Sequence, residues 1–180
     1  MMRPMTTEVR QGARSGGNPA DWRIVPLSAA PIEVCHSPDP DHISVGNPSL
    51  VAFPGGRLAI AVDYTGPGLK ETLSGLKGRD PQTGHWLQGK LYISNDKGQT
   101  WTPRADYPFH QSRLFRVGST LYLVGLCGGL RIMRSLDGGE TWSLPQQVFD
   151  AVAAGWLAAG SPALAVDALG TVHVAWVRAG

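Results

Sequence analysis

The sequence predicts an all-β fold of the β-propeller type, in which antiparallel sheets of four strands, called blades, pack side by side in a ring. Three observations predict it. The pattern S-x-D-x-G-x-T-W occurs at 94–101 and again at 135–142, 41 residues further on. Short apolar runs of strand length flank both copies, and 23 glycines and 14 prolines provide many turns. A repeat of this length built from short strands is typical of propeller blades and not of helical repeats.

Each copy of the pattern, here called an octad, has the chemistry of a tight hairpin turn. Its Asp is expected to accept hydrogen bonds from backbone N–H groups further along the turn. Its Gly supplies the positive φ that such a turn needs, and its Trp packs between neighbouring sheets. A carboxylate engaged in its own turn is a poor proton carrier, so we predict a structural role for both octads. The residues concerned are Ser94, Asp96, Gly98, Thr100, Trp101, Ser135, Asp137, Gly139, Thr141 and Trp142.

The first predicted blade covers about 43–105. Its four strands are expected at 48–53, 57–63, 89–93 and 101–105. A short Pro-Gly-Gly turn joins the first two strands, and the first octad joins the last two. A long loop, 64–88, lies between the second strand and the third.

The second predicted blade covers 113–149. Its strands are expected at 113–117, 120–126, 130–134 and 142–149, with the second octad between the last two. A third blade, 161–177, begins with strands at 161–166 and 171–177 and is incomplete. The Ala-rich stretch 151–159 is either a loop or one helical turn, and 22–35 is a candidate for one extra strand.

About two and a half blades are thus predicted, in a partial propeller at 22–180 that follows a flexible lead-in at 1–21. A ring of blades buries its core only when the blades pack all the way round. We therefore expect this chain to be a fragment, to come from a truncated reading frame, or to be completed by missing blades or a partner chain.

Composition and motifs exclude several classes of function. A formal net charge of +2 gives no argument for a nucleic-acid partner. No signal-peptide core or membrane-spanning run is visible, which predicts a cytoplasmic protein by default and no membrane span. No dithiol, zinc-protease or phosphate-loop motif occurs, so no metal and no cofactor is predicted. Cys35 and Cys127 could pair, but two buried thiols are the simpler interpretation.

The paired octads resemble the Asp-box (BNR) repeat of the sialidase and neuraminidase superfamily. The resemblance covers about 43–177 and is carried mainly by the octads. It implies a sialidase-like propeller, which is six-bladed in that superfamily, and a glycoside hydrolase of the exo-α-sialidase type that acts on terminal sugars of glycans. Relatives are often secreted or periplasmic. Asp boxes also occur in non-catalytic propellers, so a glycan- or protein-binding propeller and an inactive fragment stay open as alternatives.

The resemblance also implies a set of binding and catalytic groups. Sialidases hold the carboxylate of their substrate with three arginines and use a Tyr–Glu pair as nucleophile and an Asp as acid/base. The first arginine belongs to an F-R-I-P motif, which aligns here with Val45-Gly46-Asn47-Pro48. The proline is kept and Gly46 stands in place of the arginine, which favours a changed substrate or lost catalysis.

Strand direction assigns the connections to the two ends of the sheets. The octads leave one end, whereas the loop 64–88 and the connections 106–112 and 150–160 leave the other. Binding and catalytic residues concentrate on long loops over a rigid scaffold. We therefore expect a glycan or oligosaccharide ligand at the end opposite to the octads.

Two residues at this end are candidate catalytic groups. Asp63 ends a predicted strand and is a candidate acid/base, the alternative being a hydrogen-bond acceptor at a strand end. His110 lies just before an inner strand and is a candidate for binding sugar hydroxyls or moving protons, the alternative being a hydrogen-bonded loop histidine.

Four further residues are candidate substrate-binding groups, namely Arg113, Arg79, Tyr64 and Trp86. Arg113 would contact an acidic sugar, or it is a surface charge on its strand. Trp86 would stack on a sugar ring, or it covers the top of the propeller.

Overall fold

The computed structural model describes residues 30–179, except for the side chains of residues 158, 161 and 179. The chain divides into two compact units, Met1–Glu33 and Val34–Gly180, and every strand described below lies in the second. The predicted lead-in at 1–21 lies outside the described residues, as does most of the candidate strand at 22–35. Residues 30–35 form no strand.

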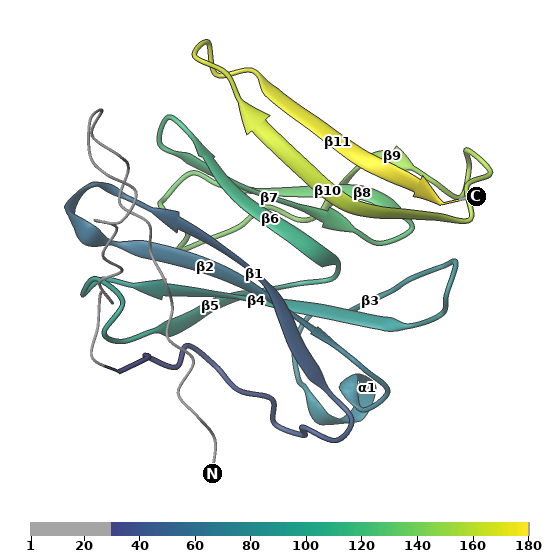
Figure 1. Ribbon diagram of the computed structural model, residues 1–180, viewed down its shortest axis with the longest axis horizontal. Coiled ribbons are helices and arrows are strands. Elements are labelled where there is room, and N and C mark those ends of the chain that lie inside the picture. The colour runs from purple at the N-terminus through teal and green to yellow at the C-terminus, as the bar shows by residue number, and fades with distance from the viewer. Residues whose placement is uncertain (1–29, 180) are drawn as a thin grey trace, which may run out of the picture. The chain divides into compact units, whose positions relative to one another are not determined.

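The first sheet contains five antiparallel strands, in the order β1-β2-β4-β3 with β5 also paired to β4 (Figure 1). They are β1 (Ser44–Ala52), β2 (Leu58–Thr65), β3 (Gly78–Arg79), β4 (Trp86–Ser94) and β5 (Thr102–Tyr107). A short 3-10 helix, Pro54–Gly56, joins β1 to β2. Helix α1 (Leu69–Thr72) lies between β2 and β3.

The second sheet has four antiparallel strands in sequence order, and a pair of strands follows it. The four are β6 (His110–Val117), β7 (Thr120–Leu126), β8 (Gly129–Ser135) and β9 (Gln146–Asp150). The pair is β10 (Ala158–Val166) and β11 (Val172–Ala179). An all-β structure of antiparallel sheets is thereby confirmed, and β7 has the predicted bounds.

The structure differs from the predicted strands in several places. Strands β1, β6 and β10 begin four, three and three residues before their predicted starts, because each continues beyond the bulge in its ladder. Strand β4 begins at Trp86, three residues before the predicted start, because it pairs with β3 as well as with the end of β2. Strand β9 begins at Gln146 because residues 143–145, after the second octad, are not part of the ladder. The stretch 151–159 forms a hydrogen-bonded turn at 151–155, in which Ala154 N donates to Asp150 O, and then enters β10.

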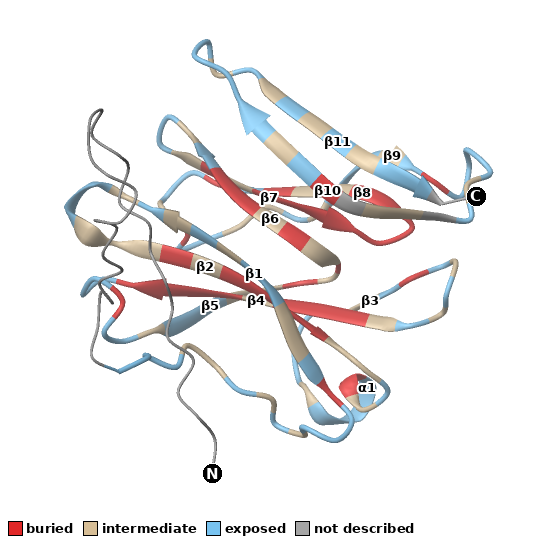
Figure 2. Cartoon of the chain, viewed as in Figure 1, coloured by how far each residue is buried: buried red, intermediate tan, exposed pale blue. Residues whose placement is uncertain are grey.

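The largest hydrophobic core lies between the first and second sheets. It contains Ala61 from β2, Leu91 and Ile93 from β4, and Leu121 and Leu123 from β7. Buried residues run along β2, β4, β6, β7 and β8 (red in Figure 2). Burying one such Leu or Ile side chain contributes about 1.5–3 kcal/mol, so this core fixes the two sheets against each other.

A second core joins the second sheet to the β10–β11 pair. Phe115, Val124 and Leu130 are buried there, and Leu164 of β10 and Val174 of β11 pack against them. A side-chain hydrogen bond also links the first strands of the first two sheets. The Ser49 hydroxyl of β1 accepts it from Leu114 N of β6 at 2.8 Å. The first strands of the three sheets therefore lie near one another, and this meeting point positions the site.

Candidate functional site

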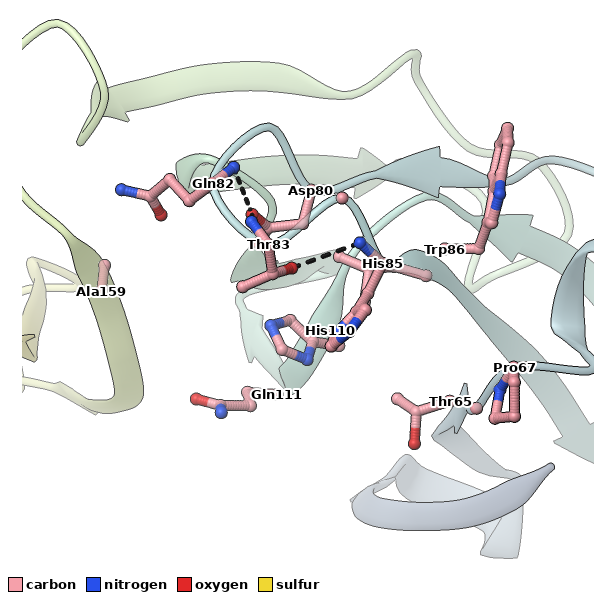
Figure 3. A pocket seen from close by; sticks show the side chains of 13 residues that line it. Thr65, Pro67, Asp80, Gln82, Thr83, His85, Trp86, His110, Gln111 and Ala159 are labelled. Atoms are coloured by element: carbon pink, nitrogen blue, oxygen red, sulfur yellow. Dashed lines mark hydrogen bonds between the residues drawn. The ribbon is translucent and has the colours of Figure 1, made fainter. Parts of the chain in front are cut away.

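A cavity of about 570 Å³ lies where the three sheets meet (Figure 3). Its lining comes from the end of β2, the β3–β4 hairpin, the start of β6, and β10. The lining residues are Thr65, Gly66, Pro67, Asp80, Gln82, Thr83, Gly84, His85, Trp86, Leu87, His110, Gln111 and Ala159. A volume of this size falls within the range of about 300–1,000 Å³ that is usual for small-molecule sites.

This cavity lies at the end of the sheets opposite to the octads. Strand β4 has nine residues and carries Trp86 at its first and the octad residue Ser94 at its last. At a rise of about 3.3 Å per residue, these ends are separated by about 26 Å. The connections that the sequence assigned to the functional end, 64–88 and 106–112, both contribute to the lining.

The tip of the β3–β4 hairpin forms one wall and is held by its own hydrogen bonds. The Asp80 carboxylate accepts from Gln82 N at 2.8 Å and from Thr83 N at 3.1 Å, and Asp80 N donates to His85 O at 2.9 Å. Thr83 Oγ1 accepts from His85 N at 3.3 Å (dashed in Figure 3). The short loop therefore presents the His85 and Trp86 side chains from a fixed backbone.

The same tip is tied to the connection that follows β9. Gln82 Nε2 donates to Trp156 O at 2.6 Å. Pro81 packs so closely on Gly128 that a Cβ at Gly128 would lie 2.5 Å from the Pro81 ring. Two connections of the second sheet, one after β7 and one after β9, thus support this wall.

A β-bulge at the start of β6 brings two consecutive side chains into the cavity. Adjacent residues of a regular strand point to opposite faces. The register of β6 shifts between His110 and Arg113, and Gln111 adopts φ +51°, which is unusual for a residue other than Gly. His110 and Gln111 therefore both line the cavity.

The bulge recurs in the first strand of each sheet. The register of β1 shifts between Gly46 and Ser49, with Asn47 at φ +49°, and that of β10 shifts between Gly160 and Ala163. By this alignment, His110 occupies the place that Gly46 holds in β1 and Gly160 holds in β10. The middle sheet alone thus carries a large side chain at this place among the described strands.

His110 is a half-buried imidazole next to two carboxylates and a second imidazole. Burial lowers the pKa of His110, the charges of Asp63 and Asp80 oppose this shift, and His85 adds to the lowering. With its pKa below the ordinary value of 6.5, His110 is neutral at pH 7. It can then accept one hydrogen bond and donate another, which suits contact with a hydroxyl group.

The structure places Asp63 away from the cavity, in a buried junction between the first two sheets. Asp63 is 1% exposed. Its carboxylate accepts from the Tyr107 hydroxyl at 2.8 Å, the Ser112 hydroxyl at 2.8 Å and Ser112 N at 3.2 Å. Burial and the neighbouring Asp63 charge hold the pKa of Tyr107 well above its ordinary value, so Tyr107 remains a donor. Asp63 is therefore a buried hydrogen-bond acceptor, which was the alternative interpretation of this residue. The expectation that it faces a ligand is corrected.

Three of the four candidate substrate-binding residues also lie outside the lining. Tyr64 is 2% exposed, and its hydroxyl bonds that of Tyr92 at 3.0 Å, so it belongs to the core. Arg79 Nε donates to Gly84 O within its own hairpin at 3.1 Å, and Arg113 Nη1 donates to Ser112 O at 2.9 Å. Of the candidates, Trp86 and His110 are the two that the fold brings together in the cavity.

Several lining residues were not singled out as site residues from the sequence. Asp80, Gln82 and Thr83 come together through a hairpin whose short strand β3 has two residues, too few for a periodic signal. The Asp-Pro-x-x-Gly sequence from Asp80 to Gly84 is the one local signal of that turn.

Both octads adopt the same hydrogen-bonded turn. In the first, Asp96 accepts from the Thr100 hydroxyl at 2.6 Å and from Thr100 N at 2.9 Å, and Ser94 Oγ accepts from Gly98 N at 2.7 Å. Trp101 Nε1 donates to Gly98 O at 3.1 Å. The second octad repeats each bond within 0.1 Å.

These bonds lower the pKa of both octad carboxyls. The Thr100 hydroxyl is the largest cause for Asp96, whose pKa falls to about 2. The Thr141 hydroxyl acts in the same way on Asp137. Hydrogen bonds within the turns therefore stabilise the charged form of both carboxyls.

Cys127 is buried and Cys35 partly buried, and both are free thiols. Within residues 30–179, no three His, Cys, Asp or Glu side chains come together in a way that could hold a metal ion. In the same part of the chain, no helix has the length and apolar character needed to cross a membrane.

Fold and site together define an all-β protein of antiparallel sheets with a cavity at the end opposite to two Asp-containing turns. The family described as BNR/Asp-box repeat matches residues 92–103 and 133–144. The chain therefore carries two BNR/Asp-box repeats, and the interpretation of the octads is confirmed.

No curated protein matches the sequence. Among solved structures, a protein of unknown function from Dyadobacter fermentans is similar at 19% identity and a TM-score of 0.48, over 71% of this chain and 32% of that one. The catalytic domain of a GH62 α-L-arabinofuranosidase from Coprinopsis cinerea is similar at 12% identity and a TM-score of 0.49, over 79% of this chain and 49% of that one. A Hadza microbial sialidase is similar at 15% identity and a TM-score of 0.25, over 57% of this chain and 33% of that one. This chain thus spans a third to a half of each of these structures.

Proposed function

We propose that this protein binds glycans in the cavity between β2, the β3–β4 hairpin, β6 and β10. The observation that carries the proposal is the make-up of the lining, which combines Trp86 with residues that carry hydroxyl, amide and imidazole groups. A sugar presents hydroxyls that both donate and accept hydrogen bonds, together with apolar C–H faces. Aromatic rings contact such faces, and a few placed polar groups fix the orientation of a ligand.

We place this site in a partial sialidase-like β-propeller at 22–180, with blades at about 43–105, 113–149 and 161–177. The two repeats, their position in the β4–β5 and β8–β9 turns, and the recurring bulge of the first strands support this assignment. In a propeller, the first strands lie innermost, so a cavity bordered by β6 and β10 would lie near the axis. Function grafted on such a scaffold depends on the residues of the site.

A glycoside hydrolase acting on terminal sugars is the second candidate function. The observation that favours it is a cluster of ionisable groups, Asp80, His85 and His110, in one cavity. Glycoside hydrolysis needs one group to protonate the leaving oxygen and another to activate water or attack the sugar. Asp80 is the carboxylate of the described lining, and both hydrogen bonds from its own turn fall on Oδ1, which leaves Oδ2 as the oxygen that would act on a ligand. Neutral His110 is a proton acceptor at pH 7.

Binding is tested with a glycan microarray followed by calorimetry on the sugars that bind. We expect the full chain to bind one or more glycans, and His110→Ala to weaken that binding at least tenfold. His173→Ala is the matched control, because His173 is exposed on β11 and pairs with Asp167. A protein with folded β structure that binds no glycan, or equal binding by the His110 variant and wild type, would contradict the proposal.

Hydrolysis is tested separately with 4-nitrophenyl glycosides across pH 4–8. A hydrolase would show turnover that Asp80→Asn abolishes while the glycan still binds. Binding without turnover by the wild-type chain would exclude the second candidate on these substrates and leave the first.

A further inference from the structure

We infer that the cavity takes an uncharged glycosyl unit and discriminates against sialic and uronic acids. This inference rests on the proposed glycan-binding function and specifies its ligand class. Recognition of a carboxylate in proteins relies on cationic donors, above all on the guanidinium group, which binds both carboxylate oxygens at once. The described lining contains no Lys and no Arg.

Two arginines lie close in sequence to the lining segments, and each donates a hydrogen bond to a backbone carbonyl. Arg79 directly precedes the lining hairpin, and its Nε donates to Gly84 O. Arg113 follows the bulge of β6, and its Nη1 donates to Ser112 O. Both donors are committed to backbone carbonyls of their own segments, and neither residue lines the cavity.

Two negative charges act on His110 of the lining. Asp80 belongs to the lining and is 8% exposed, whereas Asp63 is buried outside the lining. Both carboxylates act electrostatically on His110, which lines the cavity. A carboxylate on the ligand would be repelled there, and its desolvation would not be compensated by a cation.

The polar groups of the lining suit hydroxyls instead. Thr65 and Thr83 contribute hydroxyls, and Gln82 and Gln111 contribute amides. Each of these groups is uncharged and both donates and accepts hydrogen bonds. Hydrogen bonds of Gln82 to Trp156 O and of His85 N to Thr83 hold this side of the cavity in place, so little ordering is required on binding.

The test uses pairs of sugars of which one member carries a carboxylate and the other does not. The full chain is titrated at pH 7.5 with methyl galactoside against methyl galacturonide, and methyl glucoside against methyl glucuronide. The full chain is also incubated with a glycan array that carries each sialylated glycan together with its desialylated parent. We expect at least tenfold tighter binding of the uncharged member of every pair that binds.

Two variants test the cause of this preference. Gln111→Arg places a guanidinium in the lining and is expected to gain binding of the uronide or sialylated member. Gln99→Arg adds the same charge on the exposed first octad, at the other end of β4, and is expected to leave the preference unchanged. Circular dichroism and Tm establish that both variants are folded.

The outcomes separate the inference from the function on which it rests. Equal or tighter binding of the charged members by wild type overturns the inference and leaves glycan binding in place. Failure of folded Gln111→Arg to gain acidic sugars also contradicts it. Absence of binding to every glycan overturns the proposed function and the inference together.

Discussion

Glu140 of the second octad forms an ion pair with Arg57 in the β1–β2 connection, with Oε1 and Nη2 2.5 Å apart. The other carboxylate oxygen of Glu140 pairs with Arg104 Nε of β5 at 2.8 Å. One residue of an octad in the second sheet therefore holds two arginines of the first sheet. In the first octad, the same position is occupied by Gln99.

We predict that Glu140→Gln lowers the free energy of unfolding by about 0.5–1 kcal/mol at low salt, because half-exposed ion pairs are weak and a network of two raises the value only moderately. Urea unfolding at 20 mM and 500 mM NaCl measures it, and the loss is expected to shrink at high salt. Glu71→Gln, which removes a more exposed pair with Lys70, is the control and should change little. A loss that is the same at both salt concentrations would contradict an ionic link.

The octad carboxyls predict a pH dependence of stability. The pKa of Asp96 is about 2 in the folded chain against an ordinary value of 3.8. A carboxyl whose pKa is depressed by folding stabilises the protein above its unfolded pKa, and this contribution is lost as pH falls through the folded value. We therefore expect stability to decline from about pH 4 toward pH 2.

Asp96→Asn and Asp137→Asn should remove part of that decline and lower Tm at pH 7, while binding in the distant cavity is unchanged. Thermal unfolding at several pH values, together with glycan titration, tests this. A variant with wild-type Tm that has lost binding would place the octads in the site and refute their structural role.

Substitution by Ala is expected to change the free energy of unfolding very differently at two strand glycines. A Cβ at Gly89 would lie 1.8 Å from the Tyr107 ring, whereas a Cβ at Gly46 meets nothing within 4 Å. Gly89→Ala is expected to cost at least about 1–3 kcal/mol through overpacking, and Gly46→Ala to change stability by less than about 0.5 kcal/mol. Denaturant unfolding of the two variants measures both. Equal losses would show that the Tyr107 ring does not rest on Gly89.

Asp63 is predicted to act through stability. Asp63→Ala leaves Ser112 N without its acceptor, and it also leaves one of the Tyr107 and Ser112 hydroxyls without an acceptor, because these two hydroxyls can share only one bond with each other. Each such buried group costs about 1–3 kcal/mol. The variant should therefore unfold at clearly lower urea concentration. Asp63→Asn, which keeps an acceptor oxygen, should lose less. A wild-type midpoint combined with loss of glycan turnover would restore the acid/base role that the sequence suggested.

The sequence predicts the local features of this fold well, because their causes are local. The octads are recognised since Asp, Gly and Thr act within eight residues, and the strand 120–126 is bounded by turn residues on both sides. The end of the sheets that carries the cavity also follows from strand direction together with the length of the connecting loops.

The site itself depends on contacts that no local pattern shows. The bulge at Gln111 breaks the alternation of β6 and brings this residue and His110 to one face. Asp63 is claimed by Tyr107 and Ser112, which are 44 and 49 residues away. Arg79 and Arg113 have the right charge for an acidic sugar in the sequence, and the fold directs both to backbone carbonyls.

The central claim, a glycan site between His85 and His110, is tested most directly through the imidazole nitrogens. The chain has five histidines, and the other three, His36, His42 and His173, serve as internal controls. A long-range ¹H–¹⁵N spectrum at pH 7.5 is recorded while a mixture of methyl galactoside, glucoside, mannoside, xyloside and arabinoside is added. We predict saturable shifts of the His85 and His110 resonances, with the control resonances unchanged. A folded protein in which His85 and His110 do not shift, or in which the controls shift instead, would contradict the account.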